Sequence, residues 1–382
     1  MDIVADTADL RGVRSDISSA RGLPNRFYTD PDVFEEEKRK IFESGWSCIG
    51  FGSDVPDPGC VMPINFLGTP LLAVRGSDER LRVFQNVCRH RGMILVSEKA
   101  KLSKLIRCPY HSWSYDLTGA LQATPHVGGP DNHSHPAVCK KDLGLFEVRA
   151  HEFLGAIFVN LDGAAKPFEE HARTLLQRWH AFNLPLHSGG SLGSVTMDIA
   201  CNWKLAVENY CESYHLPFIH PGLNSYSKLE DHYHIEQPGE FSGQGSRVYS
   251  PVLSRDGQRL PDFAGLGGEW DKKAEYISFF PNVLFGVHRD HTFAMLLQPV
   301  DCGRTIERLE IFYAEDVKDD ERTQELLTNN RDLWRQVFSE DVGVVEGMQR
   351  GRHCNRFDGG KFSPVMDGPT HIFHNWVAER FV

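Results

Sequence analysis

Two short segments, each pairing one cysteine with one histidine, constrain this chain more than any other feature. The first, CRHRG, contains Cys88 and His90, and the second, CPYHSW, contains Cys108 and His111. Each segment also holds a glycine or a proline, residue types that shape tight turns. Thiolate and imidazole are both common metal ligands. The spacing therefore predicts two loops that together present four ligands to one metal site.

Two kinds of metal site accept two cysteines and two histidines. A structural zinc ion binds them in a closed tetrahedron. A Rieske [2Fe-2S] cluster binds two cysteines on one iron and two histidines on the other. Zinc fingers usually pair cysteine with cysteine along the chain, whereas each segment here carries one ligand of each type, which favours the cluster. A third reading is that the four residues bind no metal.

Length and composition set outer limits on the protein. The 382 residues suggest two domains, or three at most. The nine cysteines are odd in number and no secretory leader precedes them, so reduced thiols in a cytoplasm fit better than a disulfide framework. No apolar run is long enough to span a membrane. The formal net charge of -11 argues against a nucleic-acid partner; it favours a cationic small substrate only mildly, because such a charge most often serves solubility.

The pattern of apolar, polar and turn-forming residues changes twice along the chain, which predicts three structural regions. Residues 1–45 read as a loose polar arm followed by a helix that Asp30 caps. Residues 46–163 alternate short apolar runs with Gly, Pro and Asp, as in a compact β-domain. Residues 164–382 mix helices and strands and form the third part.

The third part is predicted to contain elements of several kinds. The apolar spacing predicts helices and strands, and a stretch rich in Gly, Pro and Ser predicts a loop or lid. In chain order we expect a linking helix at 167–182, a strand at 191–203, a helix at 204–218, a loop or lid at 222–272, strands at 276–280, 283–288, 293–300 and 306–315, and a long broken helix at 319–351.

A second dense group of possible ligands lies in the segment NWKLAVENYCESYHLPFIHP. Glu208, Glu212, His215 and His220 fall within 13 positions. Glu212 and His215 are three residues apart, so we expect them on one helix face, with His220 just beyond the helix end. Two imidazoles and one carboxylate leave positions open on Fe(II) for dioxygen and substrate. The plainer alternative is a solvated helix with ordinary surface histidines.

Together the two groups resemble the α-subunits of the Rieske non-haem iron oxygenases, the aromatic-ring-hydroxylating dioxygenase family. The family patterns C-x-H-R-G, C-P-Y-H and N-W-K followed by acid-x2-H-x4-H all match, and only Ser112 stands where many relatives have glycine. The resemblance covers residues 30–382. It implies an α+β fold, with an all-β Rieske domain and a helix-grip catalytic domain built on an antiparallel sheet. It also implies a [2Fe-2S] cluster, a mononuclear Fe(II), and O2 as co-substrate.

The resemblance assigns roles to individual residues. It implies that Cys88, His90, Cys108 and His111 bind the cluster. For the mononuclear iron it implies His215, His220 and an aspartate from a distant helix. Asp341 has the matching context, with Glu340 as its adjacent competitor.

Glu212 corresponds to the acid that, in this family, bridges two subunits. The resemblance implies that Glu212 joins His215 of its own chain to His111 of a neighbouring chain and so carries electrons between them. Most relatives have aspartate here, and glutamate occurs in the branch that acts on quaternary ammonium compounds such as carnitine and glycine betaine. Glu208 is an alternative acid, next to the ligands.

The resemblance also implies partners. Electrons would come from a separate NAD(P)H-dependent reductase, directly or through a ferredoxin, since no second cluster motif or flavin-binding segment is visible. The family forms a head-to-tail ring of three copies, which predicts a homotrimer.

Three functions remain open, two of which act on a small-molecule substrate. Aromatic side chains could hold an N-methylated cation, whose hydroxylation next to nitrogen releases formaldehyde. They could instead hold an arene, giving a phenol or a cis-diol. A non-catalytic electron carrier or zinc scaffold is the third. The expected pocket walls, any of which could equally be core, are Tyr214, Phe218, Tyr226, Phe279, Phe285, His288 and Phe293.

Overall fold

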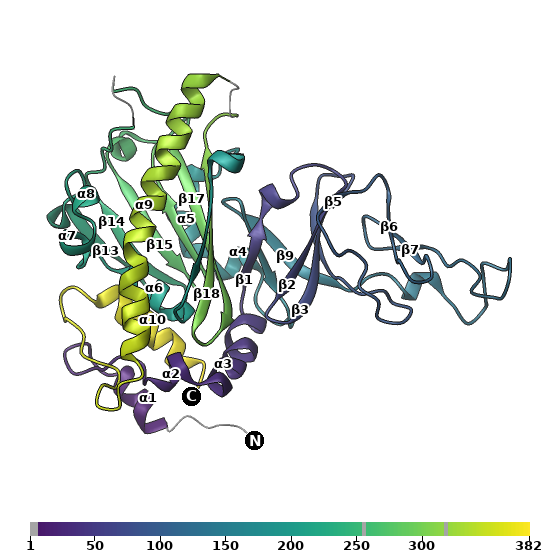
Figure 1. Cartoon of the computed structure of the whole chain (residues 1–382), viewed down its shortest axis with the longest axis horizontal. Coiled ribbons are helices and arrows are strands. Elements are labelled where there is room, and N and C mark those ends of the chain that lie inside the picture. The colour runs from purple at the N-terminus through teal and green to yellow at the C-terminus, as the bar shows by residue number, and fades with distance from the viewer. Residues whose placement is uncertain (1–6, 254–256, 317–319) are drawn as a thin grey trace. The chain divides into compact units, whose positions relative to one another are not determined.

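The computed structural model describes residues 7–253, 257–316 and 320–382, which form two compact units (Figure 1). The larger unit combines Met1–Cys48 with Ala165–Val382, and the smaller one is Ile49–Ala164. Among the described residues, no helix is both long and apolar enough to cross a bilayer.

The smaller unit is built from short antiparallel strands. Its main sheet has the order β1-β10-β9-β4-β3-β2-β5, and a second sheet has the order β6-β7-β8. Two hairpins of the main sheet turn through two residues with positive φ, Leu67–Gly68 and Leu154–Gly155, the geometry that suits the twist of paired strands. The strands are β1 Ser47–Phe51, β2 Cys60–Phe66, β3 Thr69–Arg75, β4 Leu81–Gln85, β5 Ala100–Lys101, β6 Leu105–Arg107, β7 Ser114–Asp116, β8 Leu121–Ala123, β9 Glu147–Phe153 and β10 Ala156–Asn160.

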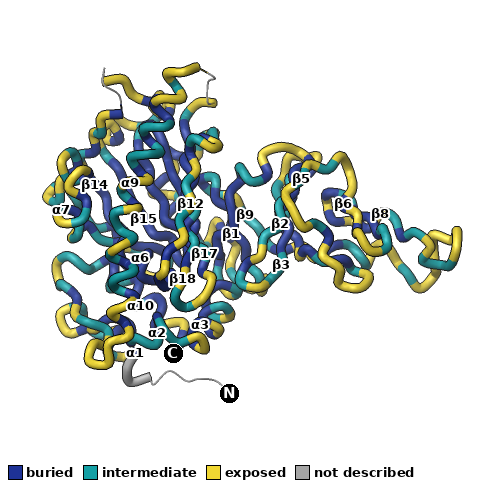
Figure 2. The backbone as a smooth tube through the Cα atoms, in the orientation of Figure 1, coloured by how far each residue is buried: buried dark blue, intermediate teal, exposed yellow. Residues whose placement is uncertain are grey.

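The larger unit is built on one antiparallel sheet with the order β11-β18-β17-β16-β15-β14-β13, and β12 also pairs with β18. Most of its strand residues are buried (Figure 2). The strands are β11 His187–Ser188, β12 Ser194–Ile199, β13 His232–Gln237, β14 Phe241–Ser246, β15 Ala274–Phe279, β16 Val283–Val287, β17 His291–Asp301 and β18 Arg304–Tyr313.

Helices cover both faces of this sheet. On one face lie α6 Trp203–Cys211, α9 Glu321–Gly351 and α10 Gly368–Glu379 (Figure 1). On the other face lie α4 Phe168–His171 and α5 Arg173–Arg178, where Phe168 contacts Phe279 and Arg178 binds Glu275.

Helix α9 is continuous, so the expectation of a broken helix was wrong. The side chain of Asp320 caps its N-terminus by accepting from the N–H of Thr323. Buried side chains recur at helical spacing along it and give one face to the sheet: Leu326, Leu327, Asn330, Trp334, Phe338, Val345 and Gln349.

The segment 222–272 is not one long loop, because strands β13 and β14 form a hairpin within it; residues 254–256 lie outside the described part. The glycines of this segment suggested a loop, but two of them, Gly243 and Gly245, lie in β14 and are sites of close packing in the sheet. A Cβ at Gly243 would lie 2.0 Å from the carbonyl oxygen of Tyr276, and one at Gly245 would lie 2.3 Å from the ring of Tyr233.

The N-terminal segment is packed rather than loose over the residues that the structure describes. Leu10 and Val13 of helix α1 (Thr7–Val13) are buried, and so is Leu23 after it. The N–H of Leu23 donates to Nδ1 of His374 on α10 at 2.9 Å.

The single helix expected at 167–182 is divided in the structure into α4, α5 and a short 3-10 turn.

The N-W-K segment anchors helix α6. Asn202 caps the helix by accepting from the N–H of Lys204. Trp203 Nε1–H and Lys204 Nζ both donate to the buried carboxylate of Glu37, at 3.0 and 2.5 Å. Glu37 ends helix α3 (Pro31–Glu37), so the motif ties α6 to the N-terminal segment. Burial raises the pKa of Glu37 and lowers that of Lys204, because it disfavours the charged form of each. The attraction between the two charges opposes this effect, so removing either partner would leave the other as an unpaired buried group.

Candidate metal centres

The two cysteine–histidine loops of the smaller unit have the same backbone fold. In each, the cysteine N–H donates to the carbonyl five residues on, and the N–H four residues on donates back to the cysteine carbonyl. That fourth residue is Gly92 in the loop after β4 and Ser112 in the loop after β6, with φ of 74° and 57°. The repeated turn presents one thiol and one imidazole from each loop.

The four side chains meet as two pairs. Cys88 and Cys108 are buried, and the hydroxyl of Tyr115 lies 3.3 Å from Sγ of Cys88. The rings of His90 and His111 are 4.7 Å apart, edge to face. Burial raises the pKa of the Cys88 thiol, an effect that a bound metal reverses because it binds thiolate.

Nδ1 of His111 is buried and has no hydrogen-bond partner among the described residues. A buried nitrogen left without a partner costs free energy unless something binds it. A metal ligand fulfils that need, so the donor set fits a cluster with one cysteine pair and one histidine pair.

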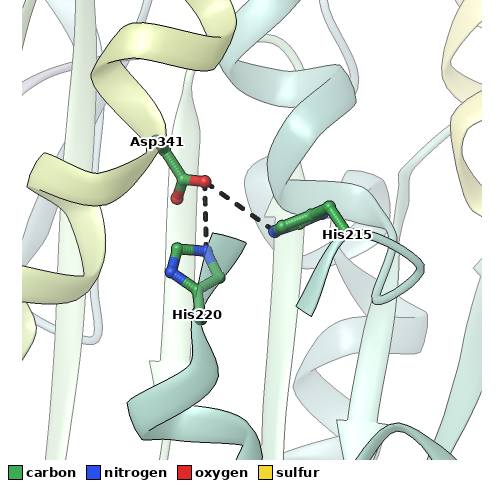
Figure 3. A group of neighbouring side chains, drawn as sticks. All are labelled: His215, His220 and Asp341. Atoms are coloured by element: carbon green, nitrogen blue, oxygen red, sulfur yellow. Dashed lines mark ion pairs between the residues drawn. The ribbon is translucent and has the colours of Figure 1, made fainter. Parts of the chain in front are cut away.

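In the larger unit, His215, His220 and Asp341 converge on one point (Figure 3). One ligand atom from each lies within 4.8 Å of the others. Oδ1 of Asp341 is 3.0 Å from Nε2 of His220 and 3.8 Å from Nε2 of His215. The amide of Asn209 on α6 donates to the same oxygen at 3.2 Å and orients it. Two imidazoles and a carboxylate in this arrangement fit a mononuclear Fe(II).

Two further carboxylates orient the imidazoles. Nδ1–H of His215 donates to Glu212 at 2.5 Å, and Nδ1–H of His220 donates to Glu340 at 2.8 Å. Both Nε2 atoms are thereby turned toward Asp341. The two adjacent acids of α9 are thus separated by geometry, since Glu340 faces the outer nitrogen of His220 and Asp341 the inner one. Burial disfavours the charged form of His220, but hydrogen bonds to Asp341 and Glu340 outweigh it and raise its pKa.

Glu212 and His215 meet without sharing a helix, so the expected common helix face was wrong. Helix α6 ends at Cys211, and Glu212 is extended. Its carboxylate accepts from the N–H of Tyr214, from the N–H of His215 and from the ring of His215. Short helices α7 (Leu216–Ile219) and α8 (Pro221–Asn224) follow, and His220 lies between them.

Glu208 does not contact this group. Its buried carboxylate accepts from the hydroxyl of Tyr28 at 2.5 Å and pairs with His374 at 3.2 Å and Arg352 at 3.5 Å. It therefore links α6 to the N-terminal segment and α10.

A cavity with ≈ 420 Å³ of empty space, part of it open to solvent, adjoins the candidate iron ligands. Besides His215, His220 and Asp341, its lining residues are Asn209, Tyr210, Leu216, Leu223, His232, Gln244, Tyr276, Trp334, Val337 and Phe338.

None of the seven side chains expected as pocket walls lines this cavity. Phe279 and Phe285 point to the opposite face of the sheet, where they contact His171 and Trp179, because alternate strand residues face opposite ways. Phe293 faces the cavity side but packs behind Trp334.

The other four also lie outside the lining. His288 is fully buried behind the wall, with Nε2 3.2 Å from the hydroxyl of Tyr276. Tyr226 packs against Tyr249. Tyr214 and Phe218 are 48% and 75% exposed and lie outside the cavity lining; the N–H of Tyr214 donates to Glu212.

The sequence analysis missed the aromatic side chains that do line the cavity. Trp334 and Phe338 precede Asp341 by seven and three residues on α9, so helical spacing places all three on one face. Trp334 is held in place by its Nε1–H, which donates to His291 at 2.9 Å, and His291 in turn donates to Asp290 at 2.7 Å. Spacing measured backward from the acid was the signal that could have found them.

Comparison with known proteins agrees with both centres. Residues 45–136 match the model of the Rieske [2Fe-2S] domain. Residues 186–381, just over half of the chain, match the model of the ring hydroxylating alpha subunit (catalytic domain). The chain belongs to the ring-hydroxylating alpha-subunit family. This Rieske oxygenase α-subunit therefore uses a [2Fe-2S] cluster, a mononuclear iron and O2.

Among relatives of this α-subunit, the glycine betaine monooxygenase oxygenase subunit of Pseudomonas aeruginosa (strain UCBPP-PA14) is 33% identical over 94% of this chain and 89% of its own. The carnitine monooxygenase oxygenase subunit of Escherichia coli (strain K12) is 28% identical over 94% of this chain and 93% of its own. A solved quaternary ammonium Rieske monooxygenase is 25% identical, with a TM-score of 0.78 over 97% of this chain and 98% of its own.

Proposed function

We propose that this α-subunit hydroxylates a carbon next to the nitrogen of a quaternary ammonium or betaine-like substrate and thereby removes an N-alkyl group. The observation that carries the proposal is the wall of the cavity. Tyr210, Tyr276, Trp334 and Phe338 place four aromatic rings around a space whose acidic member is Asp341. Aromatic faces attract a desolvated cation with about 0.5–2 kcal/mol each. The relatives named for carnitine and glycine betaine support this choice.

The chemistry balances with the two cofactors of the family. When bound, the cluster and the iron supply two electrons and a binding position for O2. Substrate, O2, two electrons and two protons then give a carbinol next to nitrogen and one water. Its C–N bond breaks, the electron pair returns to nitrogen, the hydroxyl proton leaves, and an aldehyde is released, which is formaldehyde when the group is methyl.

Each site residue has a proposed role. We assign the cluster to Cys88, His90, Cys108 and His111, and the mononuclear iron to His215, His220 and Asp341. Glu212 and Glu340 hold the outer N–H groups of the two imidazoles, which keeps Nε2 free for the metal. We further propose that 46–163 is the cluster domain and 164–382 the iron domain, preceded by 1–45.

We propose a head-to-tail homotrimer in which Glu212 contacts His111 of the partner subunit. Two exposed surfaces support it. Tyr110, next to His111, is 56% exposed, and Phe218, whose N–H donates to the main-chain oxygen of His215, is 75% exposed. Covering these two side chains with a partner subunit would remove apolar surface from water, which supports an interface at both ends of the proposed electron path. A heterologous contact of this kind closes into a ring.

A separate NAD(P)H-dependent reductase, with or without a ferredoxin, would refill the cluster. We place the protein in the cytoplasm, because its nine cysteines form no disulfide and most are buried thiols.

A single-turnover experiment tests the substrate. The iron-loaded protein is reduced chemically and mixed with O2 and either choline, glycine betaine, carnitine, 3,3-dimethyl-1-butanol or toluene, and products are read by mass spectrometry and by formaldehyde release. We expect a dealkylated amine and an aldehyde from one of the cations. The butanol, which is choline with carbon in place of charged nitrogen, should react far less than choline if choline is the substrate.

The aromatic wall has its own test. Trp334→Leu should weaken binding of the reactive cation by roughly 3- to 30-fold, whereas Trp270→Leu, which removes an indole outside the cavity, should leave it unchanged. Hydroxylated toluene, with no reaction of any cation, would contradict the proposal and favour an arene in the same cavity.

The bridging role is tested separately. Glu212→Gln should stop turnover in the intact trimer while the cluster stays at wild-type level and, with Fe(II) supplied in excess to offset the weaker hold on His215, the iron site stays loaded. Full activity of this variant would refute the bridge, and loss of iron would instead mark Glu212 as needed for metal binding.

A further inference from the structure

Gln244 lies between the substrate cavity and Glu212. It belongs to β14, is buried, and lines the cavity together with His232 and His215. Its Nε2–H donates to the main-chain oxygen of Glu212 at 3.2 Å, and its Oε1 accepts from Nδ1–H of His232 at 2.5 Å. Because only the amide nitrogen donates and only the oxygen accepts, these two contacts fix the orientation of the side chain.

The carbonyl that Gln244 binds is one that helix geometry leaves without a partner. Glu212 is the C-cap of α6, and the last carbonyls of a helix have no partner within it. The bond from Gln244 therefore holds the main chain of Glu212 from one side. From the other side, the carboxylate of Glu212 is held by the N–H groups of Tyr214 and His215 and by the ring of His215.

The other end of Gln244 is anchored in the sheet. The hydroxyl of Ser227 lies 3.0 Å from Nε2 of His232, which accepts its proton because Nδ1–H is the nitrogen that donates to Gln244, and Oγ of Ser227 also lies 2.7 Å from Oγ of Ser246. The chain Ser227–His232–Gln244–Glu212 is thus one continuous set of hydrogen bonds, and its two middle members form part of the cavity wall. A molecule in the cavity touches this wall and His215 at the same time.

We infer that Gln244 is a positioning residue that sets the place of the Glu212 carboxylate and makes it respond to substrate in the cavity. Substrate packed against Gln244 and His232 keeps the amide bonded to Glu212, and Glu212 then presents its carboxylate to His215 in a fixed geometry. The amide makes this bond in the structure without substrate, and substrate packed against it would restrict its motion further and so hold Glu212 more firmly. The role in electron transfer rests on the proposed function, whereas the positioning of Glu212 does not.

The first measurement needs no substrate. Hydrogen exchange of residues 213–216 is followed by mass spectrometry in the holoprotein and in three variants. Gln244→Leu removes both bonds, and Gln244→Glu keeps an acceptor for His232 but has no donor for Glu212. Gln237→Leu, on the neighbouring strand and outside the cavity, is the matched control. In both Gln244 variants we expect about fivefold faster exchange of the Tyr214 and His215 amides, the factor given by one net hydrogen bond, and no change in the control. Unchanged exchange would overturn the inference.

The second measurement follows cluster oxidation by O2 in the chemically reduced holoprotein, with and without carnitine, choline or glycine betaine. In wild type and in Gln237→Leu, the reactive cation should speed the oxidation. Both Gln244 variants should lose most of that acceleration, with iron content unchanged. If a higher cation concentration restores the full acceleration in the Gln244 variants, Gln244 only contributes to substrate binding. That result would overturn the inference that Gln244 couples the substrate to Glu212. If no cation affects the wild type, the proposed function fails, and the exchange rates alone decide whether Gln244 positions Glu212.

Discussion

Ser112 occupies the left-handed backbone region that Gly92 occupies in the other cysteine–histidine loop. This region costs an L-residue with a side chain roughly 1–2 kcal/mol, because Cβ approaches a carbonyl oxygen. The cost gives a physical reason for the glycine that the family resemblance leads us to expect at this position. Ser112 therefore adopts a strained backbone conformation in this loop. Hydrogen bonds around it, such as that from the N–H of Cys108 to the carbonyl of Trp113, hold the loop in place.

The two loops allow a matched pair of substitutions. We expect Ser112→Gly to raise the free energy of unfolding by about 1 kcal/mol, and Gly92→Ala to lower it by about 1 kcal/mol. Apart from Gly92 and its two chain neighbours, no heavy atom lies within 4 Å of a Cβ built at Gly92, so the second cost comes from the local backbone conformation. Urea denaturation with the cluster absorbance as a second probe measures both. A stabilising Gly92→Ala would contradict the argument.

Adjacent acids on α9 have different expected effects on the metal. Asp341→Ala removes a proposed ligand, so mononuclear iron should be lost while the cluster colour stays. Glu340→Gln keeps the shape but weakens the hold on Nδ1 of His220, which should lower iron affinity by about 10- to 100-fold. Competition with a chelator, followed by metal analysis, ranks the variants. A larger loss from Glu340→Gln than from Asp341→Ala would reverse the assignment.

At the scale of elements, the buried carboxylate of Glu275 joins helix α5 to the sheet, on the side of the sheet away from the cavity. Glu275 of β15 accepts two bonds from Arg178 at 2.8 Å each, one from Trp179 at 2.7 Å and one from Tyr233 at 2.8 Å. Burial alone would raise its pKa, but the bonds from Arg178, Lys273 and Trp179 outweigh burial and lower the pKa to about 2.

This lowered pKa predicts a pH-dependent contribution to stability. In the unfolded chain a glutamate titrates near 4.5, so the stabilisation is fully present above that pH and is lost as the pH falls from about 4.5 toward 2. Glu275→Gln should therefore lower the free energy of unfolding by about 3 kcal/mol at pH 7. The difference from wild type should shrink steadily in acid. Urea titrations between pH 7 and pH 3 measure it, and a difference independent of pH would show that shape rather than charge matters at this site.

At the scale of the whole molecule, the proposed ring makes a prediction that no single chain can fulfil. Cys88→Ser subunits should lack the cluster, His215→Ala subunits should lack the mononuclear iron, and each homotrimer should be inactive. Trimers that contain both kinds of subunit should recover roughly one third of the wild-type rate, because one of their three junctions joins an intact cluster to an intact iron site. Assay of co-expressed, doubly tagged trimers measures this.

A mixed trimer without activity, but with normal size and metal content, would indicate that electrons pass within one chain. Phe218→Asp provides the companion control, since a charge at an interface residue that is 75% exposed in one chain should separate the trimer without disturbing its fold. Light scattering after gel filtration reports the size.

The sequence by itself determined the chemistry of the two centres. Ligand identity depends on residue type and close spacing, and the pairs Cys88–His90 and Cys108–His111, like His215–His220, lie within a few residues of each other. Strands with clear apolar runs were also predictable, because a buried strand needs them.

Only the tertiary structure decided what lies around those centres. Asp341 and Glu340 are neighbours in sequence. Which of them faces Nε2 of His220 and which faces Nδ1 is decided by the packing of α9 against His220. The cavity wall depends on which face of a strand each aromatic occupies, so Phe279 and Phe285 faced away while Tyr276 and Trp334 faced in. Gln244 reaches Glu212 across 32 positions of chain. Contacts of this range come from packing, which residue type and local spacing do not encode.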